Sequence, residues 1–505
     1  MRLPRRTKLS AALCSLAAFS MLPDAGAVHL SQTGSGQVLI FPYYTTRAST
    51  VPNTTGEFNT VFAITNATAD HKALKVRFLE SRNGREIKDM NVFLRPNDMW
   101  TAAIISTASG ARIVTNDNSC VTPGDLFTRA GADNFSDANF TGNNADFHGT
   151  SLDRTREGYF EVIEMGVISN TLLHGHMLPN SAGVPSNCGA IHALDPANGG
   201  NTTDFPFQQL SPPTGGLTGR ASIINPESGI NFTYVPTALD GWSDTVRYGG
   251  VGTGVPTLGS ATPPVSNISL ANGDQLRSTW ATGIDAVSAV LLRDSMRSEY
   301  INDAGTASRT DWILTLPTKR ELISAIASKA PFHFLASAQP SCQAQLINVG
   351  ITAYRRDSTA QAACSSSIPT VCPLPPPALN PSNICFVTSV IPLSTFSVLG
   401  SQSMAFFNSP ANAFVVSSNT TAGAATSVPG QVQGPNGSLT LALTGNTHRM
   451  TPLSSTLNGQ SIPVRTMTGV PMVGFGIHSY TRSGVVSNYG GVIPATYTIS
   501  PMNLQ

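Results

Sequence analysis

The stretch ALKVRFLESRNGREIKDMNVFL, residues 73–94, is the strongest indication of the fold class of this chain. Apolar side chains fall on every second position before and after a turn, at Leu74, Val76, Phe78, Met90, Val92 and Leu94. This period of two is typical of a half-buried strand, with Lys75 and Arg77 on the other face. Between the two runs, Asn83-Gly84 is a strong hairpin signal, because both residues tolerate a positive φ. The stretch therefore predicts two antiparallel strands joined by a tight turn.

Strand patterns continue on both sides of this hairpin. Residues 60–65 read as a strand buried on both faces, and residues 99–106 follow the turn at 95–98, so a meander of antiparallel strands is expected. Further strands are predicted at 38–44, 159–165, 217–224, 230–235, 311–316, 439–443 and 473–477. Only residues 284–293 show the periodicity of a helix. The sequence thus predicts a mainly β protein of immunoglobulin-like antiparallel β-sandwich domains with one short helix.

The length of 505 residues exceeds what one hydrophobic core usually supports, so two domains are expected. The Pro-rich run at 210–213 is the predicted boundary between them. An N-terminal β-sandwich domain would cover 28–213, and a C-terminal β-rich domain would cover 214–505. The second domain would contain a disulfide-stapled, Pro-rich excursion at 342–385.

Residues 1–27 have the pattern of a signal peptide. Arg2, Arg5, Arg6 and Lys8 precede a short apolar run, and Ala25-Gly26-Ala27 matches the small-residue cleavage site. We expect the mature chain to begin at Val28 and to be exported to the periplasm, the cell surface or the medium. No other stretch is apolar enough to predict a transmembrane helix.

The charge of the mature chain argues against nucleic-acid binding. The leader carries four basic residues and one acid, Asp24, so its removal takes the formal net charge from +1 to −2. Nucleic-acid binding needs a clustered positive surface, and the remaining charges form no basic stripe. We therefore expect protein or glycan partners at the cell surface, including a second copy of the chain, and no nucleic acid.

Six cysteines remain after the leader: Cys120, Cys188, Cys342, Cys364, Cys372 and Cys385. An even number in an exported chain predicts three disulfides. Cys120 and Cys188 stand alone in the first half and pair most economically with each other. The other four can pair among themselves in three ways, which the sequence leaves open. Zinc ligation is the alternative, but the chain has no C-x₂-C pair.

Glu161 and Glu164 are the candidate catalytic residues. Paired carboxylates hydrolyse glycosides when they face each other across a cleft. Residues three apart on a strand point to opposite faces, so either glutamate would need a distant partner such as Asp146 or Asp153. The alternative is that the glutamates lie on an edge strand or pair with an arginine such as Arg154 or Arg156, and only stabilise the fold.

Two patterns suggest metal binding. Asp137, Asn139 and Thr141 fall at the first ligand positions of an EF-hand-like loop, which would bind Ca²⁺, although the usual glutamate and the flanking helices are missing. His174 and His176 would share a face if their segment were a strand, which suits a transition metal. Metal-free turns and surface histidines are the alternatives.

Several blocks of sequence resemble an uncharacterised family of exported proteobacterial proteins. They are the leader at 1–27, GQVLIFPYY at 36–44, KVRFLE at 75–80, TDW at 310–312 with PTKR at 317–320, and NYGG at 488–491. The resemblance implies a Gram-negative exported protein and assigns no catalytic residue.

The expected function is that of a structural or adhesive interaction protein at the cell surface or in the periplasm. Long polar loops, near-neutral charge and the lack of an assembled catalytic motif favour it. The alternative is a secreted polysaccharide-acting hydrolase that uses a carboxylate pair. No cofactor is expected beyond the candidate Ca²⁺.

Overall fold

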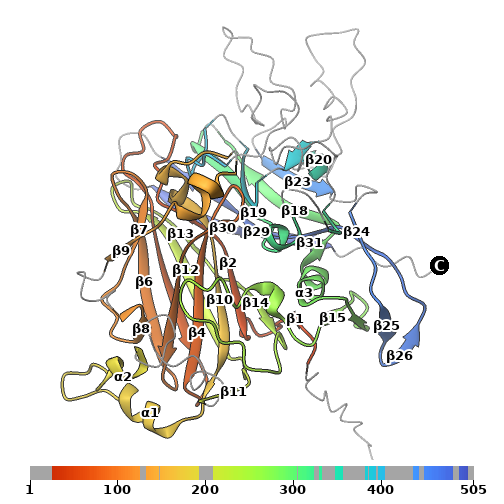
Figure 1. Ribbon diagram of the computed structural model, residues 1–505. Helices are drawn as coiled ribbons and strands as arrows, with labels where there is room; N and C mark the ends of the chain where they lie inside the picture. The colour runs from red at the N-terminus through yellow and green to blue at the C-terminus, as the bar shows by residue number, and fades with distance from the viewer. Residues whose placement is uncertain are drawn as a thin grey trace, which may run out of the picture.

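The computed structural model describes residues 26–124, 132–146, 148–192, 209–303, 305–323, 329–332, 347–355, 382–384, 386–393, 396–403, 436–442, 448–481 and 488–498. Within these ranges the chain is mainly β, and its longest strands form a sandwich (Figure 1). This confirms the predicted fold class.

The hairpin predicted for residues 73–94 forms, but its turn differs from the predicted one. β4 (Lys72–Glu80) and β5 (Glu86–Leu94) pair antiparallel across residues 81–85, and of the Asn83-Gly84 pair only Gly84 has a positive φ, +64°. The Glu80 carboxylate accepts backbone N–H groups of Arg82, Asn83 and Arg85 at 2.7–2.9 Å. The turn is therefore fixed by the last residue of β4 as well as by the Asn-Gly pair.

Two sheets make up the sandwich. Across the first sheet the strands run β1 (His29–Leu30), β14 (Thr237–Asp240), β2 (Val38–Thr45), β10 (Glu157–Ile168), β4, β5 and β8 (Cys120–Thr122), with β11 (Leu210–Ser211) also pairing β10. Across the second they run β13 (Ile230–Tyr234), β12 (Leu217–Asn225), β3 (Asn59–Asn66), β6 (Met99–Ser106), β7 (Ala111–Val114) and β9 (Ala132–Asn134). The chain crosses between sheets after β3 and after β5, so the predicted continuous meander is wrong.

An aromatic core fills the space between the two sheets. Phe41 of β2 stacks on Phe160 of β10 with ring centroids 4.2 Å apart. Phe62 of β3 meets Trp100 of β6 edge to face at 5.6 Å. Burial of apolar surface is the main stabilising contribution to such a fold. The sandwich is thus confirmed, whereas its immunoglobulin-like topology stays a prediction.

The burial predicted for two strands is reversed. β3 alternates rather than being buried on both faces, and Val61 on its outer face is 41% exposed. β4 is buried along its whole length rather than on one face. The reason is that segments beyond residue 240 cover the outer face of the first sheet, where carboxylates pair with Lys75 and Arg77.

The Pro-rich run at 210–213 does not end the sandwich. β11 belongs to the first sheet and β12 to the second, so this run connects the two sheets. β12 pairs β3, and β14 pairs β2, which extends the sandwich to Asp240. The division of the chain into two domains stays a prediction, but its proposed boundary lies inside this sandwich.

The remaining described strands form smaller sheets. One has the order β22 (Thr388–Pro392), β19 (Ser308–Thr315), β29 (Val473–Tyr480) and β30 (Tyr489–Pro494). Another has β21 (Ser382–Ile384), β20 (Ile347–Arg355), β23 (Asn436–Ala442), β18 (Ser295–Ile301) and β31 (Thr496–Thr498). A third has β15 (Val265–Ser269), β16 (Gln275–Thr279), β25 (Ser454–Leu457) and β26 (Gln460–Ile462). Two pairs complete the set: β17 (Leu292–Arg293) with β28 (Val470–Pro471), and β24 (Arg449–Met450) with β27 (Met467–Thr468).

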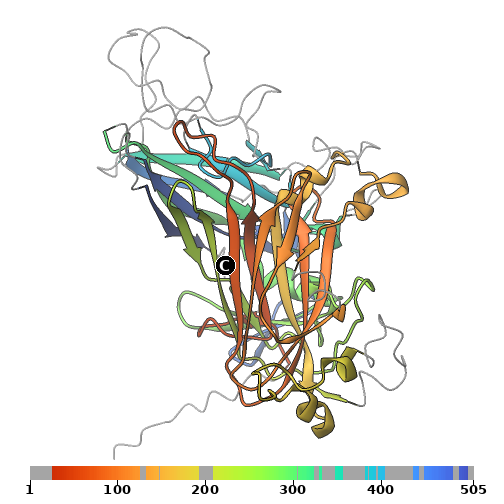
Figure 2. The same cartoon turned by 90° about the vertical axis from the view of Figure 1, so that its left-hand side faces the viewer.

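The predicted helix is present as α3 (Gly283–Leu291), whose Ile284, Val287 and Leu291 pack in a core shared with the first sheet. Three shorter α-helices were not predicted: α1 (Thr171–Met177), α2 (Cys188–His192) and α4 (Lys319–Leu322). Figures 1 and 2 place α1 and α2 at the end of the sandwich away from β18, β20 and β23. Among the described residues, no helix has the length and hydrophobicity needed to cross a bilayer.

Candidate functional site

Glu161 lies on β10 and faces Arg77 of the neighbouring strand. Its carboxylate is 3.0 Å from a guanidinium nitrogen of Arg77, which also pairs with Glu86 at 2.8 Å. Burial raises the pKa of Glu161 to about 7, although the charge of Arg77 opposes this rise. The residue is 1% exposed, so no substrate reaches it in this structure.

Glu164 is equally buried and has a different set of partners. Its carboxylate is 2.6 Å from Lys72 Nζ and accepts the backbone N–H groups of Thr214 and Gly215. Burial raises the pKa of Glu164, and Lys72 acts in the opposite direction. Glu164 therefore fastens β4 and the connection after β11 to β10.

The distant carboxylates proposed for a hydrolase are also engaged. Asp146 pairs with Arg154 at 2.6 Å, and Asp153 pairs with Arg47 at 3.1 Å. Each candidate carboxylate thus faces its own cation rather than a second carboxylate. Both glutamates therefore have structural partners, as the alternative expected, but the predicted partners and the predicted edge strand are wrong. Arg77 and Lys72 take the place of Arg154 and Arg156, and β10 lies between β2 and β4 within the sheet.

The candidate Ca²⁺ residues lie around the 3₁₀-helix η2 (Ala138–Phe140). Asn139 donates to the carbonyl of Glu86, and the Thr141 hydroxyl donates to the carbonyl of Asp137. Two of the three side chains are therefore bonded to the chain's own backbone. Within the described ranges, no three His, Cys, Asp or Glu side chains come together in a group that could hold a metal ion.

His174 and His176 lie on helix α1, not on the strand assumed for metal binding. Two residues along a helix point to nearly opposite sides, so the two rings do not share a face. His174 bonds the carbonyl of Ile168 at 2.7 Å and stacks on His71 at 3.8 Å. Burial and the adjacent His174 lower the pKa of His71 to about 4.

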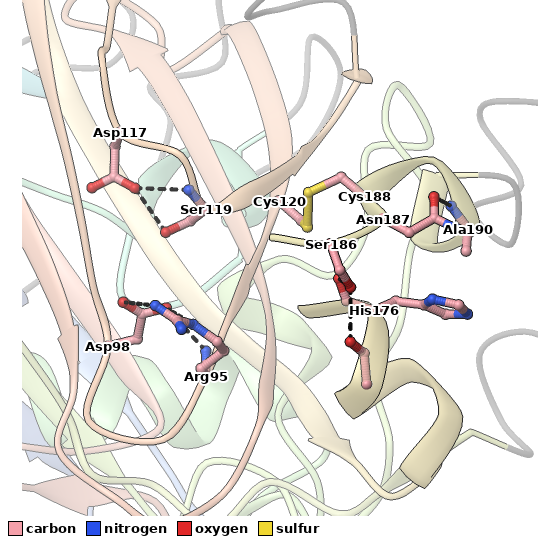
Figure 3. The surroundings of a disulfide bond; sticks show 11 residues. Arg95, Asp98, Asp117, Ser119, Cys120, His176, Ser186, Asn187, Cys188 and Ala190 are labelled. Carbon is pink, nitrogen blue, oxygen red and sulfur yellow. Dashed lines mark hydrogen bonds and ion pairs between the residues drawn. A yellow bond between two sulfur atoms is a disulfide. The ribbon is translucent and has the colours of Figure 1, made fainter. Parts of the chain in front are cut away.

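The predicted bridge between Cys120 and Cys188 is present, with Cα atoms 5.3 Å apart (Figure 3). It joins β8, at the edge of the first sheet, to helix α2. Cys342, Cys364, Cys372 and Cys385 lie outside the described residues, as does most of the excursion predicted at 342–385.

A polar pocket of about 420 Å³ opens beside this disulfide. One side comes from the turn after β5 and the start of β6, with Arg95, Asp98 and Thr101. The loop before β8 adds Asn116, Asp117, Asn118 and Ser119. The wall opposite includes Met177 at the end of α1 and residues 183 and 185. The disulfide therefore ties two walls of one pocket together.

The two carboxylates of the pocket, Asp98 and Asp117, are bonded to neighbouring residues of its lining. Asp98 pairs with Arg95 at 3.1 Å (Figure 3). One oxygen of Asp117 accepts from the backbone N–H and hydroxyl of Ser119 at 2.9 and 2.7 Å. The other accepts from the corresponding groups of Thr101 at 3.0 and 3.2 Å. Asp117 thus connects β6 to the loop before β8.

The amides of Asn116 and Asn118 remain available to a ligand. Both residues are exposed, and within the described part of the chain neither side chain makes a hydrogen bond. Phe93 and Met177 are buried beneath the lining, and Met99, which is 48% exposed, adds the accessible apolar surface. The pocket thus combines fixed polar groups, free amides and a small apolar area, as ligand sites do.

This pocket could not be predicted from the sequence. The disulfide and the turn at 95–98 were predicted, but their proximity was not, because β5 and β8 pair only in the folded sheet. The run TNDNS at 115–119 carried a usable signal, since Asn, Asp and Ser favour turns that bond their own backbone. All four tryptophans are buried, so they provide no surface platform for a sugar.

No protein-family model, curated protein or solved structure matches this chain. The resemblance to exported proteobacterial proteins therefore stays a prediction. The fold and the pocket themselves define a mainly β-sandwich protein with a disulfide-bounded polar pocket at one end of the sandwich.

Proposed function

We propose that this chain is an exported interaction protein of the cell surface or periplasm, and that the pocket beside the disulfide binds a glycan. The supporting observation is that the free amides of Asn116 and Asn118 lie beside Asp117, whose carboxylate is held by hydrogen bonds from Ser119 and Thr101. Amides both donate and accept hydrogen bonds, which suits the hydroxyl groups of a saccharide. Met99, which is 48% exposed, offers an apolar contact for the less polar face of a sugar ring.

The charges of the pocket lining indicate which class of saccharide it could bind. Arg95 is neutralised by Asp98, and Asp117 adds negative charge to the pocket wall. A strongly anionic polymer would therefore meet no unpaired cation among the described lining residues. A neutral saccharide is the ligand class that this lining favours.

A glycan array tests the proposal. The mature chain should bind a subset of neutral saccharides, and Asn116→Ala/Asn118→Ala should weaken that binding about tenfold, because two hydrogen bonds are lost. Asn134→Ala is the matched control, since Asn134 is exposed on β9 and does not line the pocket. Equal binding by the double variant and the wild type would contradict the proposal.

The second candidate function is a secreted polysaccharide-acting hydrolase. One observation favours it: Asp98 and Asp117 line the same pocket, whereas Glu161 and Glu164 are buried elsewhere. Against it, both oxygens of Asp117 already accept hydrogen bonds from Thr101 and Ser119. Release of reducing ends from a bound polysaccharide, abolished in Asp98→Asn, would establish hydrolysis. Binding without product would support the interaction protein.

A further inference from the structure

A second pocket lies where the sandwich meets the sheet of β29 and β30. Its volume is about 480 Å³, within the range of roughly 300–1,000 Å³ that small-molecule sites occupy. Pro42 of β2, Tyr234 of β13 and Phe475 of β29 line it, with Val492 of β30 nearby. β13 and β30 lie side by side here (Figure 1). The site is therefore built by segments that are far apart in the sequence.

Most of the lining is apolar and firmly held. The rings of Tyr234 and Phe475 stack with centroids 4.6 Å apart. The Tyr234 hydroxyl donates to the carbonyl of Tyr43, so the phenol oxygen is already satisfied inside the protein. Val235 at the rim is 66% exposed, which is unusual for a large aliphatic side chain. A ligand would meet preformed apolar walls.

Two polar groups of the pocket are not used by the protein. Arg220 of β12 is exposed, and its guanidinium makes no ion pair or hydrogen bond with any described residue. Thr237 of β14 likewise has no side-chain hydrogen bond in the described ranges. By contrast, the Thr233 hydroxyl is engaged with Ser222 and Asn231. The pocket thus offers one cation and one hydroxyl beside an apolar cavity.

We propose that this pocket binds a small amphipathic carboxylate, with its apolar body against the wall formed by Tyr234, Phe475 and Val492 and its carboxylate on Arg220. An arginine matches a carboxylate in both charge and planar geometry. Thr237 supplies a further hydrogen-bond donor to the same anion. This site is distinct from the polar pocket beside the disulfide and does not depend on the function proposed for it.

Calorimetric titration of the full mature chain with decanoate and with decanol tests this site. The two probes share an apolar tail and differ in the charged group. The wild type should bind decanoate at least tenfold more tightly than decanol. Arg220→Gln should remove that difference, and Arg220→Lys should restore part of it. Arg449→Gln, at an exposed arginine of β24, is the matched control and should bind as the wild type.

A pocket-filling variant locates the binding. Val235→Trp places a large ring at the exposed rim and should weaken decanoate and decanol together, while circular dichroism should match that of the wild type. The proposal is overturned if decanoate does not bind, if Arg220→Gln retains the preference for decanoate, or if Val235→Trp leaves both affinities unchanged.

Discussion

Buried ionic side chains in this chain are held in compact pairs and triads. Arg154 is the clearest case, since its guanidinium contacts both oxygens of Glu80 at 2.8 and 2.9 Å and both oxygens of Asp146 at 2.6 Å. It also lies 4.4 Å from the centre of the Phe140 ring. This cluster links the hairpin turn after β4 to the loop at 137–156.

Replacing Arg154 should be strongly destabilising. Arg154→Met would leave Glu80 and Asp146 buried without their cation, and such a loss costs about 3–5 kcal/mol of unfolding free energy. Urea denaturation followed by circular dichroism measures the change. Arg449→Met, at an exposed position, should change stability by less than about 0.5 kcal/mol.

The pH dependence of the Arg154 cluster follows from Asp146. Burial favours its protonated form, but hydrogen bonds from Arg154 and Asn83 hold the pKa of Asp146 well below its usual 3.8. A carboxyl group whose pKa is lowered by folding stabilises the folded state at pH values above its pKa in the unfolded state. This stability is lost as the pH falls. Arg154→Met should therefore flatten the loss of stability below pH 4. A variant as acid-sensitive as the wild type would contradict this account.

Glu161 should show the opposite pH dependence. Its pKa is raised by burial to about 7 from a usual 4.5, so the folded state retains a proton that the unfolded state has lost. Stability from this group is present below about pH 4.5 and declines as the pH rises toward 7. Glu161→Gln should remove that decline, a difference of at most about 3 kcal/mol. Parallel stability curves for variant and wild type between pH 5 and 8 would show that Glu161 does not titrate there.

At the level of elements, the edge of the first sheet carries the candidate glycan site. β8 is the last strand of that sheet, and the disulfide fastens α2 to it. α1 and α2 follow β10 in the chain, and the bridge anchors this segment, residues 169–192, to β8. The pocket exists only where these segments meet.

Removing the disulfide should therefore reduce both stability and ligand binding. The bridge spans 68 residues, and a loop of this size corresponds to about 4 kcal/mol in the chain-entropy treatment. Cys120→Ala/Cys188→Ala should lower the unfolding free energy by about that amount. It should also weaken saccharide binding, because Met177 and residues 183–185 are no longer held opposite Asn116. The double variant is preferable to a reductant, which would also reduce the other predicted disulfides.

A variant that loses stability but binds saccharide as the wild type does would separate the two roles. The bridge would then stabilise the fold without shaping the pocket. Unchanged binding of decanoate at the second pocket is the internal control for a folded chain, since none of that pocket's residues lies between residues 169 and 192.

The local sequence pattern was sufficient to predict several strands and the longest helix. It was insufficient to predict which of their side chains are covered by other parts of the chain. Alternation located β4, β5 and α3, and cysteine spacing located the bridge between Cys120 and Cys188. The burial of Lys75 and Arg77 could not be predicted, because it depends on Asp89, Glu86 and chain segments after residue 240. The strand assumed for His174 and His176 was wrong for a different reason, because a seven-residue helix is too short to show helical periodicity.

Over the whole molecule, the two halves of the chain share one core. Val38, Ile163 and Leu239 of the first sheet pack in the same cluster as α3 and Trp312 of β19. The ion pair of Arg77 with Glu161 lies on this covered face, close enough to Glu321 for its charge to raise the pKa of Glu161. We therefore expect the halves to unfold together.

The predicted export signal leads to a testable order of events. Ala27 and Val28 are completely buried, and the Val28 N–H bonds the carbonyl of Val265 at 2.8 Å. Cleavage between them should therefore precede folding. Intact-mass measurement of the protein from periplasmic and surface fractions should show a chain that begins at Val28. A folded chain that retains residues 1–27 in the cytoplasmic fraction would contradict the export prediction.

The glycan site beside the disulfide would be tested by a crystal structure of the mature chain with the saccharide that binds most tightly on the array. We expect a sugar ring in the pocket beside the Cys120–Cys188 bridge, with hydrogen bonds to the amides of Asn116 and Asn118. A saccharide bound at another surface, or an empty pocket at saturating ligand, would contradict it.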